Sequence, residues 1–182
     1  MAKRQPKVRG RHADFIASVG ELLNDLAPLH CDATLVGGMA LVTLGSPRVT
    51  KDFDFLVVEE AREQKAVIEV FYRHGFELVS GTDEHGNVLR TIDNLAVASA
   101  RLRMDRPQSA YFYNRGLGLR VDLLFDFPIG AREVRRRSTR KTIQSYVLHI
   151  ASRRDLIRMK EIAAAARGLS SDLQDLEFLK HA

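Results

Sequence analysis

Two carboxylates one residue apart mark the stretch of the sequence that is best suited to chemistry. Asp52 and Asp54 lie within the apolar run VTKDFDFLVV (49–58). In an extended strand, residues i and i+2 point to the same face. Both acids would therefore share one face, while Phe53 and Phe55 would point into a core on the other. Two like charges side by side are costly unless a cation lies between them, so the pattern predicts a metal site on a strand.

A pair of glycines precedes these acids. Gly37 and Gly38 join a predicted buried strand (33–38) to a predicted short helix (39–45). Backbone N–H groups at a helix start favour anions, and glycine lets a phosphate approach the backbone closely. Glycine pairs are also common in ordinary turns. No Gly-Lys-Ser/Thr follows, which excludes a Walker loop. From these residues alone, a phosphate site and a structural turn both remain open.

The two features together resemble the signature of the DNA polymerase β-like nucleotidyltransferase superfamily. Thirteen residues (39–51) separate the glycine pair from the acids, a spacing typical of that signature. Arg48 and Thr50 fit the Arg-x-Thr-x-Asp-apolar-Asp run of small bacterial members that are related to abortive-infection and toxin–antitoxin nucleotidyltransferases. The resemblance implies that the glycine turn, Arg48 and Thr50 bind the NTP substrate. It also implies that the paired acids hold two Mg²⁺ or Mn²⁺ ions.

A third metal-binding carboxylate on a later strand is a further implication of the resemblance. The run LRVDLLFDF (119–127) offers Asp122 and Asp126, which would lie ~13 Å apart along a strand. Asp122 is preferred because it lies inside the apolar run, where an unpaired acid would be costly. Asp126 would lie at the exposed end of the strand. The predicted catalytic and metal-binding set is therefore Asp52, Asp54 and Asp122.

Two predicted helices close the chain and offer a cation for the phosphates. Ser152 and Asp155 form a capping-box pattern ahead of the first helix. Lys160 in that helix is similar to a phosphate-binding lysine of the superfamily, with a surface lysine lying along apolar neighbours as the alternative. Asp172 and Asp175 resemble a Lys-Asp-x-x-Asp-Leu ending of related proteins. Because the lysine of that ending is missing here, helix capping is the preferred interpretation of both acids.

The irregular order of helices and strands predicts an α+β (mixed α/β) fold. We expect a mixed twisted β-sheet with flanking helices and a short C-terminal helical segment, which is the nucleotidyltransferase fold that the resemblance implies. The expected parts are a basic flexible tail (1–11), a catalytic core (12–150) and C-terminal helices packed on the core (151–182). Within the core, ARLRM (100–104) and TIQSYVLHI (142–150) are interpreted as strands.

The charge distribution favours a polyanionic partner. The formal net charge is +5, and basic residues gather in segments 3–11 and 132–141. Such patches suit RNA, for example tRNA, although a solvated charged face gives the same pattern. Tyr111, Phe112 and Tyr113 fit a surface that stacks on a base, with an aromatic strand packed on the sheet as the alternative.

Several classes of protein and site are excluded. No apolar run is long enough to cross a bilayer, and the N-terminal segment lacks an apolar signal region, so we expect a cytoplasmic protein without membrane contact. The single cysteine, Cys31, excludes an internal disulfide and a cysteine-based zinc cluster. The paired acids lack the further ligands and the glycine of an EF-hand loop.

The predicted function is Mg²⁺-dependent transfer of an NMP from an NTP to an acceptor hydroxyl, with tRNA or another RNA as the acceptor. The resemblance implies a toxin-like protein with an antitoxin or toxin partner. One alternative is a non-catalytic nucleotide-binding or antitoxin-like module, against which the intact acids argue. The other is a small-molecule (antibiotic) adenylyltransferase, but the basic patches suit RNA better than a polycationic aminoglycoside.

Overall fold

The computed structural model describes residues 9–58, 64–105 and 108–181. Its strands are short and follow the apolar runs of the sequence. They are β1 (Thr34–Val36), β2 (Phe53–Val57), β3 (Glu77–Thr82), β4 (Val88–Ile92), β5 (Ser109–Asn114), β6 (Leu119–Phe125), β7 (Thr139–Ile143) and β8 (Tyr146–Ile150).

The eight strands form one mixed sheet in the order β4-β3-β5-β6-β2-β1-β8-β7. β2 pairs in parallel with β6, and β1 pairs in parallel with β8. The other neighbouring strands are antiparallel. This mixed sheet confirms the α+β expectation.

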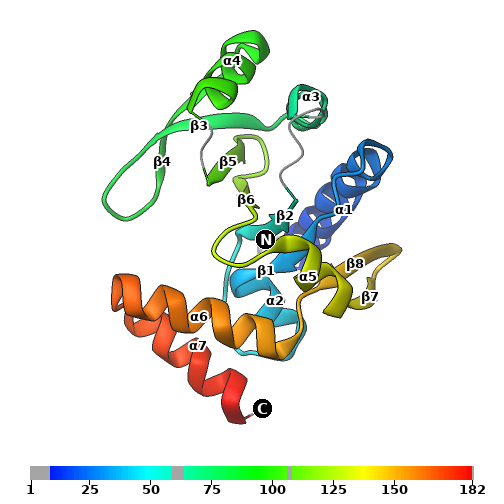
Figure 1. Ribbon diagram of the computed structural model, residues 1–182. Helices are drawn as coiled ribbons and strands as arrows, with labels where there is room; N and C mark the ends of the chain where they lie inside the picture. Colours follow the sequence, from blue (N-terminus) through cyan, green and yellow to red (C-terminus); the bar gives the residue numbers. More distant parts are fainter. Residues whose placement is uncertain (1–8, 59–63, 106–107, 182) are drawn as a thin grey trace, which may run out of the picture.

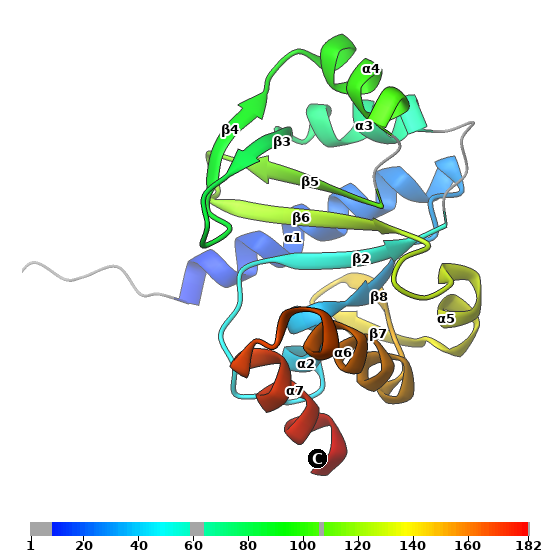
Figure 2. The same ribbon diagram turned by 60° about the vertical axis from the view of Figure 1, so that its left-hand side comes forward.

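The helices surround the sheet, as Figures 1 and 2 show. They are α1 (Arg9–Leu26) with the short 3₁₀ turn η1 (Ala27–Leu29), α2 (Gly37–Thr43), α3 (Gln64–Arg73), α4 (Leu95–Asp105), α5 (Ala131–Arg137), α6 (Arg153–Arg167) and α7 (Ser170–His181). α6 and α7 pack against each other near the start of α2 (Figure 2). No helix among the described residues is long and apolar enough to cross a membrane.

The core explains how β2 is oriented. Phe53, Phe55 and Val57 are each 1% exposed, and the two phenylalanine rings stack 6.4 Å apart. The predicted alternation along this strand is therefore confirmed. With the aromatic side chains anchored in the core, Asp54 is directed to the opposite face of the sheet.

Two predicted strands are wrong. Residues 100–104 belong to helix α4, because Ala98 and Leu102 lie four residues apart and both are buried, which satisfies a helical period as well as an alternating one. Segment 142–150 is a hairpin of β7 and β8 rather than one strand. Gln144 makes the turn with a left-handed φ of 56°.

The N-terminal boundary also differs from the expectation. Helix α1 begins at Arg9, within the segment expected to be a flexible tail. Arg9 and Arg11 belong to this helix, whereas Lys3, Arg4 and Lys7 lie outside the described residues. Ser152 caps α6 as predicted, since its hydroxyl accepts a hydrogen bond from the Asp155 backbone N–H.

Candidate functional site

One row of paired residues crosses the middle of the sheet and carries the acids. Val36 on β1 pairs with Asp54 on β2, Asp54 pairs with Asp122 on β6, and Asp122 pairs with Tyr111 on β5. Residues paired directly across strands share one face, and neighbouring strands lie ~4.8 Å apart. The sheet thus brings Asp122 beside Asp54. Asp126 instead accepts a hydrogen bond from the Ala131 backbone N–H at 2.9 Å, in the loop after β6.

The electrostatics of the acids reflect their crowding. Asp122 is 3% exposed. Burial, followed by the negative charge of Asp52, raises the pKa of the Asp54 carboxyl. Burial, followed by the charge of Asp54, raises the pKa of Asp122 to about 7, although a neighbouring guanidinium acts in the opposite direction. The three carboxylates therefore repel one another, as expected for ligands that await a cation.

That guanidinium belongs to Arg120, which the sequence analysis did not single out. It lies two residues before Asp122 on β6 and so shares its face. Its Nε and Nη2 donate to the two oxygens of Asp122 at 2.9 and 2.8 Å, and Nη2 lies 3.6 Å from an oxygen of Asp52. Burial acts to lower the pKa of Arg120, but the neighbouring acids outweigh it and raise that pKa. The i−2 spacing from Asp122 was the signal in the sequence.

The residues fit a divalent cation in their chemistry, since hard carboxylate oxygens are the ligands that Mg²⁺ prefers. As they are arranged here, the described residues form no group of three or more histidine, cysteine, aspartate or glutamate side chains that could hold a metal ion. Arg120 contacts both Asp122 and Asp52. The three acids could therefore share a cation only once this guanidinium moves away from them.

The glycine pair is required by close contacts at this site. Gly37 has a left-handed φ of 62°, and a Cβ placed on it would lie 1.9 Å from a carboxylate oxygen of Asp54. A Cβ on Gly38 would lie 2.9 Å from the guanidinium carbon of Arg48. Side chains here would displace the acid and the cation, so the two glycines position Asp54 and Arg48.

A buried ion network joins the C-terminal helices to this corner. Lys160 on α6 lies 2.9 Å from an oxygen of Asp172 and 2.6 Å from one of Asp175, and Arg48 also pairs with Asp175. Asp172 and Asp175 are 2% and 5% exposed. The capping interpretation of these acids is therefore corrected, because their carboxylates are buried partners of two cations. Lys160 has a side chain only 14% exposed, so it is not a surface lysine.

All eight residues that were predicted to bind the metal or the NTP line one cavity of about 520 Å³, a size typical of small-molecule sites. They are Gly37, Gly38, Arg48, Thr50, Asp52, Asp54, Asp122 and Lys160. The hydroxyl of Thr50 accepts a hydrogen bond from the Asp52 backbone N–H at 3.4 Å, so it helps to orient the loop that carries the first acid. Arg120, Tyr111 and Asp172 line the same cavity.

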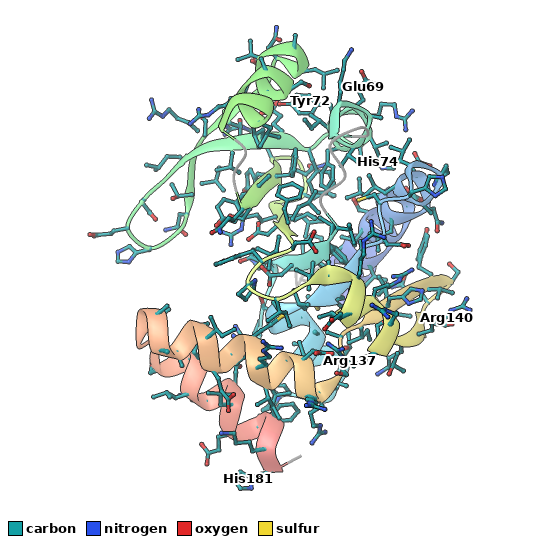
Figure 3. The ribbon with its side chains drawn as sticks, viewed as in Figure 1. Glu69, Tyr72, His74, Arg137, Arg140 and His181 are labelled. Atoms are coloured by element: carbon teal, nitrogen blue, oxygen red, sulfur yellow. The ribbon has the colours of Figure 1, made fainter. Side chains whose placement is uncertain are left out.

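The basic stretch 132–141 divides into structural and exposed residues. Arg137 binds both oxygens of Asp155 at 3.1 and 2.7 Å, and Arg135 donates to the Ala33 carbonyl at 2.9 Å. Arg136 and Arg140 are exposed. In Figure 3, Arg137 lies between α5 and the start of α6, whereas Arg140 lies at the outer edge of the molecule. Part of the predicted patch therefore holds the fold together.

Comparison with known families gives one match. Residues 21–181 match the family described as nucleotidyl transferase AbiEii toxin, type IV toxin–antitoxin system. This match spans both the acids and the C-terminal ion network. No curated protein matches the chain.

Solved structures with the same fold are nucleotidyltransferases or similar to them. An antigenic nucleotidyltransferase-like protein from Paracoccidioides brasiliensis aligns with a TM-score of 0.59 and 16% identity over 92% of this chain and 75% of that protein. The lincomycin-bound lincosamide adenylyltransferase LnuA gives 0.56 and 10% over 91% and 96%. The antibiotic-resistance factor ANT(2'')-Ia gives 0.56 and 13% over 92% and 83%. At these identities the similarity establishes the fold.

Proposed function

The chain belongs to the AbiEii nucleotidyl transferase toxin family, and we propose that it transfers an NMP from an NTP to a hydroxyl of an RNA acceptor in a Mg²⁺-dependent reaction. Family membership establishes that it is a nucleotidyltransferase, so the non-catalytic alternative is not retained. The observation that carries the proposal is the convergence of three carboxylates with Arg48 and Lys160 on one cavity.

The NTP phosphates would lie on the β1 side of the acids. Gly37 and Gly38 contribute backbone N–H groups there, and Lys160 and Arg48 contribute positive charge to the same wall. Ammonium and guanidinium groups make strong charge-assisted hydrogen bonds to phosphate. Asp172 and Asp175 would act as positioning residues, because their buried carboxylates hold both cations in place. This arrangement supports binding of the triphosphate at the glycine corner.

In the proposed reaction, the acceptor oxygen attacks the α-phosphorus, the bond to the β-phosphate oxygen breaks, and pyrophosphate leaves. Mg²⁺ would be held by Asp52 and Asp54, and also by Asp122 once Arg120 has moved away from it. When bound, the metal would lower the pKa of the acceptor hydroxyl and offset the charge on the leaving group. Asp122 would take the hydroxyl proton, since it lies between Asp54 and the β5 edge of the cavity. Arg120, once free of Asp122, would offset charge that develops on the phosphates.

Exposed cations support an RNA acceptor. Arg136, Arg140 and Lys141 are exposed on α5 and β7, and such residues bind phosphate backbones in a salt-dependent manner. Segment 3–11 is the second basic segment of the sequence, and its residues before Arg9 lie outside the described residues. The toxin–antitoxin description of the family also supports an antitoxin partner.

The test is to incubate the protein and Mg²⁺ with each α-labelled NTP and total RNA, and to resolve the RNA on a gel. We expect label on RNA with the wild type, and none with Asp54→Asn or after chelation of the metal. Label from Asp54→Asn at the wild-type level would refute the assignment of the acids. Label on a lincosamide or an aminoglycoside but on no RNA would refute the proposal that RNA is the acceptor.

A further inference from the structure

We propose that Tyr111 is the stacking platform for a nucleobase of the acceptor, so that the β5 side of the cavity is an acceptor subsite. This inference rests on the proposed function and extends it, since it assigns a place and a ligand chemistry to the acceptor. The juxtaposition that carries it is an exposed aromatic ring in register with the acids, on the side away from Arg48 and Lys160.

The row across the sheet fixes the direction of attack. Tyr111, Asp122 and Asp54 are direct neighbours on β5, β6 and β2, and Gly37 follows β1 at the other end of the row. In an in-line displacement, the attacking and leaving oxygens lie on opposite sides of the phosphorus. Because Gly37, Arg48 and Lys160 would hold the leaving phosphates on the β1 side, the acceptor must enter from the β5 side.

The aromatic side chains of β5 differ in exposure. Phe112 is 1% exposed and belongs to the core, whereas Tyr111 is 39% exposed and lines the cavity. Phe127, which is 42% exposed in the loop after β6, lines the same cavity. Tyr113 points to the same face as Tyr111 but is not among the cavity residues. The core therefore explains Phe112 but gives no reason for an open ring at residue 111.

The ring of Tyr111 is held in place at two points. Its hydroxyl lies 3.1 Å from the hydroxyl of Ser109, and the guanidinium carbon of Arg120 lies 5.5 Å from the ring centroid. An ordered aromatic ring loses little conformational freedom when a ligand stacks on it. The site therefore presents a preorganised flat surface beside the acids.

The chemistry of these neighbours selects a nucleobase. A flat π-system stacks on tyrosine and on an arginine plane, and base–aromatic stacking tolerates any base sequence. A polycationic acceptor would meet the charge of Arg120, and a sugar ring alone offers no planar π-face. We therefore assign the β5 side to a base adjoining the reactive hydroxyl of a single-stranded RNA end.

The absence of tryptophan from the sequence gives a direct test. Tyr111→Trp places a single tryptophan at the subsite, and Tyr113→Trp places one on the same strand and face but outside the cavity. Each variant would be titrated with a short single-stranded RNA and with the same RNA carrying an abasic 3′ residue. The complete RNA should quench the fluorescence of Tyr111→Trp, with an apparent affinity about tenfold tighter than that of the abasic RNA. The fluorescence of the Tyr113→Trp control should change little with either RNA, because residue 113 is not among the cavity residues.

Kinetics separate this subsite from the proposed function. Tyr111→Ala should raise the KM for the acceptor about tenfold and leave the KM for the NTP unchanged. Tyr111→Phe, which keeps the ring but loses the Ser109 contact, should raise the acceptor KM less than Tyr111→Ala does. If the wild type labels RNA and Tyr111→Ala does so with an unchanged acceptor KM, the subsite is wrong and the proposed function stands. If the wild type labels no RNA, the proposed function fails. Equal quenching of Tyr111→Trp by complete and abasic RNA would overturn the subsite, whether or not the wild type labels RNA.

Discussion

Two acidic regions of the molecule differ in how their charge is balanced. At the start of α6, the buried Asp155 receives hydrogen bonds from Arg137 and accepts one from Ser152. Burial alone would raise the pKa of Asp155, but these bonds outweigh it and lower the pKa. In the middle of the sheet, Asp52 and Asp122 share the guanidinium of Arg120, and the pKa values of Asp54 and Asp122 are raised.

This difference in charge balance indicates that Asp155 has a structural role and that the acids of the cavity have a functional one. The Asp155 carboxylate has its partners within the fold, so its ionised form stabilises the protein. The positive charge around Asp54 on β2 and Asp122 on β6 does not offset their burial and mutual repulsion, so their ionised forms destabilise the fold until a ligand brings a cation. A strained and incompletely neutralised cluster in a cavity is typical of a functional site. Substitutions in the two regions should therefore have opposite effects on stability and activity.

The largest combined effect is expected for Lys160→Ala. The substitution removes a phosphate partner and leaves the buried Asp172 and Asp175 without their ammonium. We expect the free energy of unfolding to fall by about 3 kcal/mol, and the KM for the NTP to rise by about tenfold or more. Denaturant unfolding and steady-state kinetics measure the two quantities. Lys180→Ala is the control, because its pair with Glu161 is exposed. Wild-type stability and KM in Lys160→Ala would show that the ion network has neither role.

Asp155→Ala tests the balanced region. Loss of the carboxylate that accepts from Ser152 and Arg137 should lower the free energy of unfolding by about 2 kcal/mol, while the transfer rate of the folded protein stays unchanged. Because the folded pKa of Asp155 is lowered, the stabilisation is present above the unfolded pKa of about 3.9 and is lost as the pH falls through the folded pKa. Urea unfolding at pH 7 and at pH 3 checks this dependence.

Glu133→Ala is the matched control for that experiment. Glu133 is exposed and contacts the same Arg137 at 3.6 Å, so its removal should have almost no effect on stability. If Glu133→Ala is as destabilising as Asp155→Ala, the buried carboxylate of Asp155 is not the source of the stability.

The smallest expected effect is a gain in stability from Asp54→Asn. Because the folded pKa of Asp54 is raised, its ionised form costs stability above the unfolded pKa, and this cost grows as the pH rises through the window above about 4. The amide should raise the free energy of unfolding by about 1 kcal/mol, with a larger gain at pH 8 than at pH 5. Thermal unfolding at both pH values provides the measurement. A loss of stability at pH 8 would mean that Arg48, Lys160 and Arg120 already balance the charge of Asp54.

The sequence predicted where the acids and their strand lie, and there is a physical reason for it. The alternation of Phe53 and Phe55 with Asp52 and Asp54 follows the period of a strand, and the core accepts the rings. The choice of Asp122 relied on burial within an apolar run, and the register of β6 against β2 bears out its proximity to Asp54. Local patterns were sufficient here because the strand period alone fixes which side chains share a face.

Contacts between distant segments were harder to predict. Arg120 contacts both Asp122 and Asp52, and Asp175 meets Arg48 across more than a hundred residues of sequence. The spacing of Asp172 and Asp175 fits ordinary surface residues or caps equally well, so only the packing of α7 against α2 and α6 resolves the roles of these two acids. The strand prediction for residues 100–104 was wrong because so short an apolar pattern fits the period of a helix as well as that of a strand.

Binding of Mn²⁺ tests the central claim most directly, which is that three acids from two strands share a cation. Calorimetric titrations of the wild type, Asp54→Asn, Asp122→Asn and Asp126→Asn, each confirmed as folded by circular dichroism, separate the acids by position. We predict that the apparent Kd rises at least about tenfold in the first two variants and is unchanged in Asp126→Asn, whose amide oxygen can still accept from Ala131. Wild-type affinity in Asp122→Asn, together with lost affinity in Asp126→Asn, would contradict the account.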